Sequence, residues 1–525
     1  MTPATFRLSS SFRDQSGFLF TENGTLFRSV SRRYRQHYDH LLQSGLYDKL
    51  VENKLIIPHE EVDPGTIKHF PGSRADIYKI IQPERVPFIS YPYEWCFSQL
   101  KDAALTTLKI QKQALDYGMV LKDANAYNVQ FHKGLPLLID TLSFEIYQEN
   151  QPWVAYRQFC QHFLAPLALM ASRDIRLGQF MRIYIDGLPL DLASGLLPLA
   201  SLLKPALLTH IHLHAKAQKR YGQSDGKNTG WHPTNSSPPA GGDKMEGANG
   251  EHSPLSHQAL SGRKVSKTAL LGIVDSLETS VNKLKWQPTG TEWADYYEDT
   301  NYSPAAMNHK KQLVDAYLKE IKPRTVWDLG ANTGVFSRIA AANDAETIAF
   351  DVDAAAVEKN YLMAKEGNVS RGEDLSVSQS RGKDSKSVSL STEKSVILPL
   401  CLDLTNPSPA IGWANAERLS LIERGPADTV LALALIHHLA ISNNVSFRHV
   451  AFFLSQLCRF LIIEFVPKND SQVQRLLRIR EDVFPDYGQD HFEAFFGENF
   501  SLIKHEKITD TERTLYLMRS RNTRN

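Results

Sequence analysis

The second half of the chain alternates short apolar runs with segments of helical periodicity. Apolar runs of strand length occur at residues 325–329, 347–351, 396–402, 428–435 and 460–465. Helix-like segments at 335–342 and 354–365 separate the first three runs. Strands that alternate with helices predict a parallel sheet covered on both faces, so we expect a doubly wound α/β domain here.

The first half has a different pattern and predicts a separate α+β domain. It is rich in apolar and aromatic positions up to about residue 215, after which Gly, Ser, Pro and Asn dominate. We therefore divide the chain into an N-terminal accessory domain at 1–215, a flexible linker at 216–265 and a second domain at 266–525. Residues 367–393, rich in Ser, Lys, Asp and Gly, predict a disordered surface insertion in the second domain.

Composition narrows the class of protein. A chain of 525 residues predicts two or three domains. A net charge of +1 gives no strong signal for nucleic-acid binding. The four cysteines lack the spacing of a metal or redox motif, and the N-terminus lacks a leader pattern, so we expect a cytoplasmic protein with reduced thiols. The most apolar stretch, 188–208, is broken by Asp191, Pro198 and Lys204, so we expect no membrane span.

A glycine-containing loop follows the first strand of the second domain. The chain there reads Asp328-Leu329-Gly330-Ala331-Asn332-Thr333-Gly334. At the carboxyl end of a parallel strand, glycines let the backbone approach a ligand without a Cβ in the way. Asp351 ends the next strand, where a carboxylate can accept hydrogen bonds from both ribose hydroxyls. The pattern therefore predicts a nucleoside-binding pocket.

The charges in this loop indicate which nucleoside binds. A dinucleotide site needs a glycine where this chain has Asn332, and a phosphate loop needs a Gly-Lys-Ser/Thr sequence that is absent. Asp328, just ahead of Gly330, would repel phosphate and attract a cation such as the ammonium or sulfonium of S-adenosylmethionine. A positively charged, phosphate-free nucleoside is favoured.

These motifs together resemble the class I S-adenosylmethionine-dependent methyltransferases over residues 293–519. The similar segments are the loop at 326–334, the acid Asp351, Leu402-Asp403-Leu404, the stretch 427–439, the apolar strand 461–465 and a closing antiparallel pair at 500–502 and 514–517. The resemblance implies a Rossmann-like sheet and the cofactor S-adenosylmethionine. It implies cofactor contacts from Asp328, Gly330, Asn332, Gly334, Asp351 and Asp403, with Asp403 near the adenine. The aromatic segment 293–302 either folds over the cofactor or packs as an ordinary helix.

The sequence after the fourth strand bears on the acceptor. Methyltransferases that act on planar amino groups often carry Asn/Asp-Pro-Pro-Tyr there, whereas this chain reads Ile436-His437-His438-Leu439. We therefore favour an oxygen acceptor over an amide nitrogen, with His437 or His438 as the base. The alternative is that one histidine packs against the cofactor and the other caps a helix. Glu464 either lines the acceptor pocket or pairs with a lysine, and the acceptor is a small molecule, a saccharide or a protein.

The N-terminal half contains a second group of polar residues. Asp123, Asn128 and Asp140 have the spacing of a phosphotransferase catalytic loop and its metal-binding acid, and the stretch resembles kinase-like folds. It departs from them because Leu121-Lys122 precedes the first aspartate and no glycine-rich phosphate loop is found. We expect a degenerate kinase-like fold that binds acceptor or partner. Two alternatives stay open: a bifunctional protein with an N-terminal phosphotransferase, and a module that binds the cofactor without turnover.

Three alternating histidines, His210, His212 and His214, would share one face of a strand and could then hold a metal. The surrounding Leu and Ala residues predict a helix, in which this alternation fans the side chains apart. We therefore predict no metal site there.

Overall fold

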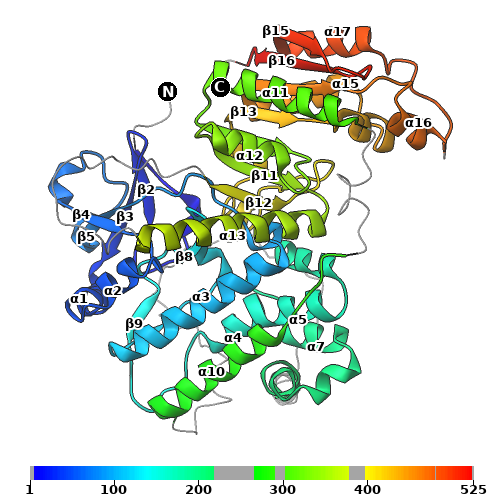
Figure 1. Cartoon of the computed structure of the whole chain (residues 1–525). Coiled ribbons are helices and arrows are strands. Elements are labelled where there is room, and N and C mark those ends of the chain that lie inside the picture. The colour runs from blue at the N-terminus through cyan, green and yellow to red at the C-terminus, as the bar shows by residue number, and fades with distance from the viewer. Residues whose placement is uncertain (1–4, 218–264, 290–301, 378–395, 479, 523–525) are drawn as a thin grey trace, which may run out of the picture.

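The computed structural model describes residues 5–217, 265–289, 302–377, 396–478 and 480–522 of the chain. Two halves lie against each other: an N-terminal half, residues 5–217 in blue to teal, and a C-terminal half, residues 302–522 in green to red, which is built around one large sheet (Figure 1). The predicted linker, apart from its ends, falls outside the described residues, and so does most of the aromatic segment 293–302. Within these ranges, no helix is both long and apolar enough to cross a membrane.

The C-terminal half is built on a seven-stranded sheet. Its strands are β10 (Thr325–Leu329), β11 (Glu346–Asp351), β12 (Ile397–Cys401), β13 (Ala427–Ala432), β14 (Cys458–Phe465), β15 (Phe500–Lys507) and β16 (Thr514–Ser520). They lie in the order β12-β11-β10-β13-β14-β16-β15. The five strands β10 to β14 run parallel to one another, and β16 is antiparallel to its two neighbours, β14 and β15. The predicted Rossmann-like sheet is confirmed, and its order reverses between β10 and β13, where such sheets leave a ligand crevice.

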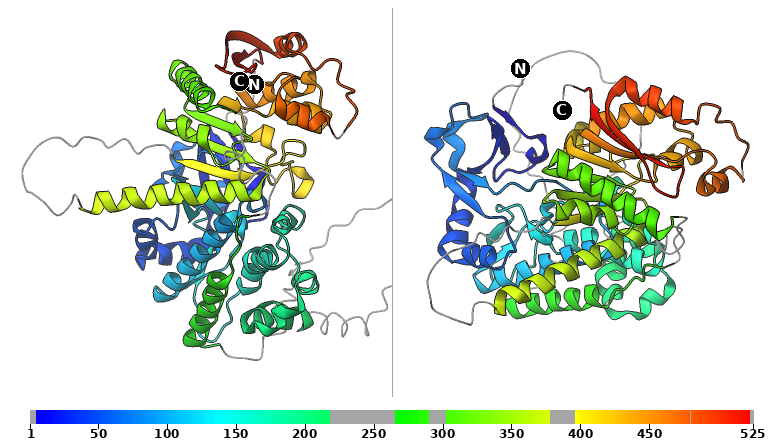
Figure 2. Two further views of the ribbon diagram at one scale, coloured as in Figure 1. Left: turned by 45° about the vertical axis from the view of Figure 1, so that its right-hand side comes forward. Right: turned by 45° about the horizontal axis from the view of Figure 1, so that its top comes forward.

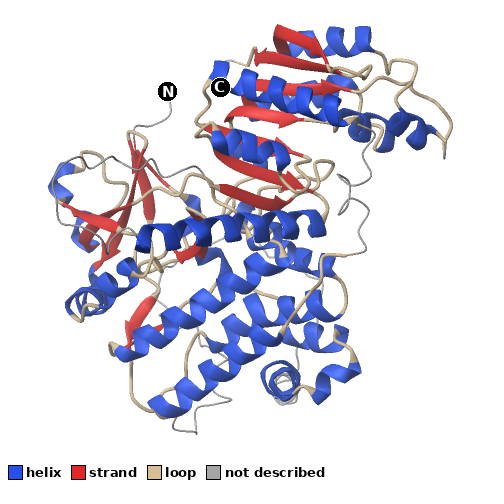
Figure 3. Cartoon of the chain, in the orientation of Figure 1, coloured by secondary structure: helices blue, strands red, loops and turns tan. Residues whose placement is uncertain are grey.

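Helices cover both faces of this sheet, as Figure 3 shows. They are α11 (Pro304–Ile321), α12 (Val335–Ala342), α13 (Ala354–Val377), α14 (Leu421–Arg424), α15 (Phe447–Leu457), α16 (Ser471–Leu477) and α17 (Gln489–Asn499). Successive strand residues point to opposite faces. Val326 and Ile462 therefore pack with α11 and α12 in one apolar layer, whereas Trp327 and Leu461 belong to the other layer, which contains α15 and α17.

Two elements of this half differ from the sequence prediction. The insertion expected at 367–393 begins as helix, because α13 continues to Val377; the part from 378 to 393 lies outside the described residues. Helix formers such as Lys365 and Glu366 extend a helix that is already nucleated, since each added residue adds one hydrogen bond. β13 ends at Ala432, before the apolar run does, and Ala434 then turns the chain with a left-handed φ of 50°.

The N-terminal half begins with a five-stranded antiparallel sheet in the order β1-β2-β3-β5-β4. Two further strand pairs follow, β6 with β9 and β7 with β8. The strands are β1 (Thr5–Arg7), β2 (Leu19–Glu22), β3 (Thr25–Ser31), β4 (His59–Val62), β5 (Ile77–Pro83), β6 (Met119–Leu121), β7 (Val129–His132), β8 (Leu135–Leu138) and β9 (Phe144–Ile146). The helices are α1 (Arg35–Gln43), α2 (Leu46–Glu52), α3 (Phe97–Asp116), α4 (Tyr156–Phe159), α5 (Ala165–Ser172), α6 (Phe180–Ile183), α7 (Leu190–Leu196) and α8 (Pro205–Leu207).

The helix that follows the linker also packs with the N-terminal half. α10 (Lys267–Lys283) lies beside α3 and away from the large sheet (Figures 1 and 2). Lys112 of α3 pairs with Asp275 and Glu278 of α10. The sequence prediction placed this helix in the second domain at 266–525, whereas in the structure it packs against the N-terminal half. An amphipathic helix fits any apolar surface of suitable shape, so its pattern alone does not identify its partner.

The N-terminal half also packs directly on the large sheet, on the face opposite α11 and α12. The ring of Phe88 lies edge-on to those of Trp327 and Phe350, with centroids 5.5 and 5.9 Å apart. Gln99 in α3 donates from Nε2 to the carbonyl of Pro399 in β12 over 2.9 Å. Buried apolar residues of both halves form one continuous core. The two halves are therefore joined through a shared interior as well as by the chain between them.

Candidate active site

The loop after β10 places both predicted glycines at the carboxyl edge of the sheet. Gly330 has a φ of +73° and Gly334 a φ of +80°, values that other residues rarely adopt. The three atoms nearest to a Cβ on Gly330 would all belong to the Leu435 side chain, and the first of them would lie 3.3 Å away, a tight contact. A Cβ on Gly334 would lie 2.5 Å from the Asn360 amide. Gly330 thus lets the Leu435 side chain approach the loop closely, whereas Gly334 lets α13 pack against the loop.

Asp351 is held against this loop by backbone hydrogen bonds. The N–H of Asn332 donates to its Oδ2 over 2.7 Å, and the N–H of Asp353 donates to its Oδ1 over 2.8 Å. Burial raises the pKa of Asp351 to about 6, although these hydrogen bonds oppose the rise. Backbone N–H groups therefore hold the carboxylate in a fixed position, from which it can accept further hydrogen bonds.

Asp328 lies beside it near the end of β10, the neighbouring strand. Its Oδ2 accepts a hydrogen bond from the Ser337 hydroxyl over 2.6 Å. Burial raises the pKa of Asp328 to about 6, and the charge of Asp351 adds to the rise. Two buried carboxyls therefore titrate close to neutral pH, and both would gain from a bound cation.

Asp403 completes the row of acids, just beyond β12. Its side chain is exposed, and its Oδ1 accepts hydrogen bonds from the backbone and hydroxyl of Thr405 over 2.8 and 2.6 Å. The N–H of Leu402 donates to the carbonyl of Asp351 over 2.8 Å, which ties the ends of β11 and β12 together. The predicted cofactor residues at the ends of β10, β11 and β12 thus lie along one edge of the sheet.

The two predicted catalytic histidines follow β13 at the same edge. Their rings lie 4.1 Å apart. His437 is 2% exposed, and in the described part of the chain its Nδ1 has no hydrogen-bond partner. Burial and the charges of His438 and Arg513 lower the pKa of His437 well below its usual value. Burial and Arg513 lower the pKa of His438 to about 4. Both imidazoles are therefore held in the neutral form at physiological pH, and the same lowered pKa makes each of them a weaker base than a free histidine.

A buried ionic cluster next to the histidines was missed by the sequence prediction. Lys310 Nζ lies 2.6 Å from Glu464 Oε2, and Arg513 Nη1 lies 3.5 Å from Glu464 Oε1. Tyr302 donates its hydroxyl to Glu464, and Arg513 also pairs with Asp470 over 2.8 and 3.0 Å. Burial opposes ionisation of Glu464, but Lys310 and Arg513 hold its pKa below the usual range. The choice left open for Glu464 is thus decided in part: it pairs with a lysine.

One signal for this cluster was present in the sequence. Lys310 occupies the apolar stripe of α11, between Ala306 and Val314 on the buried side. A lysine on such a stripe is costly to bury unless an acid pairs with it. That position could have indicated a buried partner, although not which one.

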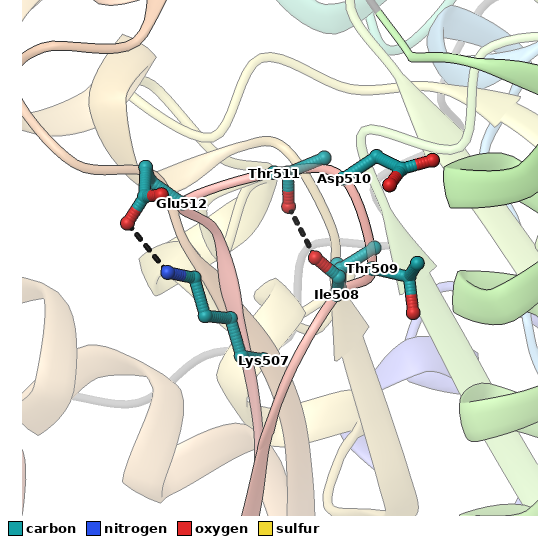
Figure 4. A pocket seen from close by; sticks show the side chains of 6 residues that line it. All are labelled: Lys507, Ile508, Thr509, Asp510, Thr511 and Glu512. Carbon is teal, nitrogen blue, oxygen red and sulfur yellow. Dashed lines mark hydrogen bonds and ion pairs between the residues drawn. The ribbon is translucent and has the colours of Figure 1, made fainter.

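The turn between β15 and β16 forms an open hollow of about 530 Å³, lined by Lys507, Ile508, Thr509, Asp510, Thr511 and Glu512 (Figure 4). β15 runs in the same direction as β14, so this turn also lies at the carboxyl edge. A smaller hollow of about 120 Å³ adjoins it at Asp470 and Arg513. Figure 4 shows that Lys507 pairs with Glu512 and that Thr511 donates to the carbonyl of Ile508. The hollow is shallow and polar, and its side chains partly satisfy one another.

In the N-terminal half, Asp123, Asn128 and Asp140 also come close together, but with many internal partners. Gln158 donates to Asp123 over 2.8 Å, and burial and the charge of Asp140 raise the pKa of Asp123. Arg28 Nη2 lies 2.9 Å from Asp140 and also pairs with Asp14. Over the described residues, no group of three or more His, Cys, Asp or Glu side chains could hold a metal ion.

The alternating histidines lie on a π-helical turn, Leu208–Leu213, and the residue after it. His210 hydrogen-bonds to Tyr156 and Ser276, and His212 hydrogen-bonds to two serines. His214 packs its ring against Tyr156, with centroids 5.1 Å apart. The helical context predicted for them is confirmed, and their contacts join helices of the N-terminal half.

Comparison with known proteins covers both the whole chain and its parts. No family model matches the chain. Among solved structures, the N-methyltransferase NodS from Bradyrhizobium japonicum WM9 is 11% identical, covers 42% of this chain and 99% of its own, and has a TM-score of 0.29. The magnesium protoporphyrin IX methyltransferase from Synechocystis PCC 6803, with bound S-adenosylmethionine, is 17% identical over 42% of this chain and 86% of its own, with a TM-score of 0.25. WbdD is 14% identical over 44% of this chain and 43% of its own, with a TM-score of 0.27.

These TM-scores are too low to add to the fold, which rests on the strand order of the sheet itself. The likeness to one curated protein is of a different kind. Nodulation protein NoeA of Rhizobium meliloti (strain 1021) is 32% identical over 516 residues, which span 98% of this chain and 96% of that protein. The match spans nearly the whole length of both chains. The chain therefore belongs to the family of nodulation protein NoeA.

Proposed function

We propose that the chain is an S-adenosylmethionine-dependent methyltransferase whose cofactor lies across the ends of β10, β11 and β12. The observation that carries the proposal is the pair of buried carboxyls, Asp328 and Asp351, beside the glycine-containing loop that follows β10. Asp351 would hold the ribose, Asp328 the methionine end and Asp403 the adenine. The cofactor supplies a methyl group on a sulfonium, and that cation suits two carboxyls whose ionisation burial disfavours.

The charges near the loop also argue against phosphate-containing cofactors. Asp328 would repel a pyrophosphate at the point where a dinucleotide needs close backbone approach. Two cations near the loop are already engaged: Arg338 donates to the carbonyl of Thr333 over 2.6 Å and to Asn360 over 3.2 Å, and Lys310 pairs with Glu464. The residues present therefore suit an adenosine without phosphates.

The proposed acceptor is a hydroxyl of a small molecule, a saccharide or a protein. Transfer to oxygen requires a base that is unprotonated at working pH, and His437 and His438 meet this condition because burial lowers the pKa of both. We assign the role of general base to one of these two histidines. The rest of the rate would come from alignment of acceptor, methyl group and sulfur in a closed site.

Calorimetry with S-adenosylhomocysteine, S-adenosylmethionine and NAD tests the cofactor. We expect both adenosyl compounds to bind at the same single site and NAD not to compete. Binding of NAD alone would overturn the proposal. Labelled methyl transfer to extract fractions then separates an enzyme from a module that binds the cofactor without turnover, and identification of the labelled product gives the acceptor.

For the N-terminal half we propose a degenerate kinase-like fold without phosphotransfer. An antiparallel sheet with α1 and α2 between its third and fourth strands, then α3 and a loop with Asp123 and Asn128, supports the likeness. The pairing of Asp140 with Arg28 argues against a metal-binding role, because the acid already has a cation. Magnesium-dependent ATP turnover that is lost in Asp140→Ala would favour the bifunctional alternative. None of the four cysteines, all of which lie in the described residues, forms a disulfide, as suits the cytoplasmic location that we also propose.

A further inference from the structure

Glu94, in the N-terminal half, joins that half to the large sheet. It is fully buried, and its two carboxylate oxygens lie 2.9 and 2.5 Å from Nη1 and Nη2 of Arg424. The N–H of Tyr91 donates to it over 2.9 Å, and the Ser408 hydroxyl donates to it as well. A carboxylate with this many donors is well compensated for its burial. Glu94 therefore ties one segment of the N-terminal half to two separate segments of the C-terminal half.

Arg424 is held in place by the same N-terminal segment. Its Nη1 also donates to the carbonyl of Ile89 over 2.8 Å. Its guanidinium lies over the rings of Phe88 and Tyr91, 4.8 and 4.6 Å from their centroids. These contacts fix the plane of the guanidinium and so fix the position of Glu94. The carboxylate is a rigid anchor for whatever else binds to it.

Glu94 also accepts a hydrogen bond from the loop that carries Asp403. Asp403 lies near the start of the loop after β12, and Ser408 lies five residues further along it and donates a hydrogen bond to Glu94. Between them, Arg182 of the N-terminal half donates to the Asn406 side chain over 3.2 Å. Before the loop, Gln99 donates to the carbonyl of Pro399. The N-terminal half thus contacts the chain on both sides of Asp403, whose own side chain is exposed.

We propose that the N-terminal half is a structural part of the cofactor site, and that Glu94 and Ser408 are positioning residues for Asp403. This inference rests on the proposed function, in which Asp403 faces the adenine. An exposed carboxylate on a loop selects a base only if the loop is held, because a mobile acceptor loses most of the gain from its hydrogen bond to entropy. Release of the loop would therefore weaken recognition of the adenine amino group and leave the ribose contact of Asp351 in place.

Ser408→Ala gives the cleanest test, because it removes the hydroxyl from the loop and keeps the Glu94–Arg424 pair. Glu94→Gln would leave Arg424 buried with a neutral partner and could unfold the chain. The whole chain is titrated calorimetrically with S-adenosylhomocysteine and with its inosine analogue, which lacks the adenine amino group. We expect Ser408→Ala to bind S-adenosylhomocysteine about fivefold more weakly and the inosine analogue almost as wild type does.

Ser98→Ala is the matched control. The Ser98 hydroxyl also donates across the boundary between the halves, to the buried carboxylate of Glu358 on α13. Among the described residues, the Ser98 hydroxyl forms no hydrogen bond with the Asp403 loop or with Arg424, so both affinities should equal those of wild type. A loss of base selectivity in Ser408→Ala alone supports the inference.

Two other results would count against it, in different ways. If wild type binds S-adenosylhomocysteine and Ser408→Ala binds both compounds equally well as wild type, the positioning role is wrong while the proposed function stands. The same holds if the two serine variants lose affinity for both compounds to the same extent. If wild type binds neither compound, the proposed function itself is overturned.

Discussion

The edge of the large sheet and the Asp123 loop of the N-terminal half carry similar residues in different electrostatic settings. Both contain aspartates at or near strand ends, with an asparagine nearby. At the sheet edge, Asp351 is held by backbone N–H groups, and burial raises its pKa to about 6. In the N-terminal half, Asp140 is held by Arg28. Backbone N–H groups orient Asp351 without neutralising its charge, so a bound cation would still stabilise its ionised form. The charge of Asp140 is already neutralised by Arg28 within the chain.

This difference shows that the spacing of acidic residues indicates a cation-binding or ligand-binding site only when the groups that neutralise those residues are also known. A carboxylate that already has a buried guanidinium gains little from a metal or a ligand cation, because binding would have to break that pair. A carboxylate held by dipoles alone gains the full attraction of an incoming charge. The predictions below test this contrast.

The largest expected effect comes from Asp351→Ala. Loss of two charge-assisted hydrogen bonds to the ribose should weaken cofactor binding by at least about 100-fold, as measured by calorimetry. Asp140→Ala is the matched change in the N-terminal half and should leave the affinity within about twofold of wild type. Equal losses in the two variants would show that both acids act through stability and would remove the contrast.

A smaller effect is expected from Gly334→Ala, in which the new Cβ would lie 2.5 Å from the Asn360 amide. Overpacking and the left-handed φ together should cost about 2–4 kcal/mol of unfolding free energy, with weaker cofactor binding. Gly24→Ala has the same kind of φ, +82°, with nothing within 4 Å of the new Cβ. It should lose only about 1 kcal/mol in a urea titration. A Gly334→Ala variant no worse than this control would contradict the packing role of Asn360.

Cofactor affinity should depend on pH more weakly. Burial raises the pKa of Asp328 and of Asp351 to about 6, so both carboxyls are mostly protonated below that pH and attract the sulfonium only above it. Affinity should therefore rise by about tenfold between about pH 5 and pH 7 and then level off. The stability of the free protein should move the other way, because the contribution of a carboxyl with a raised pKa is lost as pH rises through that value. An affinity that falls over this range would contradict the assignment.

The smallest effect is expected at the N-terminal loop. At about a hundredfold excess over its Kd, S-adenosylhomocysteine should stabilise the protein by about 2.7 kcal/mol, visible as a higher melting temperature. Magnesium with ATP should give no shift, because Arg28 occupies Asp140. A clear shift with magnesium ATP that is absent in Asp140→Ala would show instead that the two regions are alike.

Much of the C-terminal half could be predicted because its signals are local. An apolar run gives a strand, a glycine gives a turn, and an acid at the end of a strand lies at the sheet edge whatever its partners are. Asp328, Asp351 and Asp403 came together for this reason. The packing role of Gly334 was not predictable, since it depends on Asn360 from a helix that begins only after the next strand.

Other features depend on partners far away in the chain. Lys310 meets Glu464 across 154 positions, and no local pattern relates the two. The stripe of α10 predicted a helix, but its partner α3 lies in the other half. The contact of Glu94 with Ser408 is of the same kind, across 314 positions. Sequence patterns give the elements and their edges, while the pairing of buried charges follows from the tertiary structure.

The position of α10 has a consequence for cutting the chain. This helix follows the linker in sequence yet lies against α3, which precedes it. A protease that cleaves once between residues 218 and 264 would therefore produce two fragments that stay associated, because α10 of the second fragment would remain packed on α3 of the first. Fragments that co-elute in buffer and separate only in denaturant would be the sign of this arrangement.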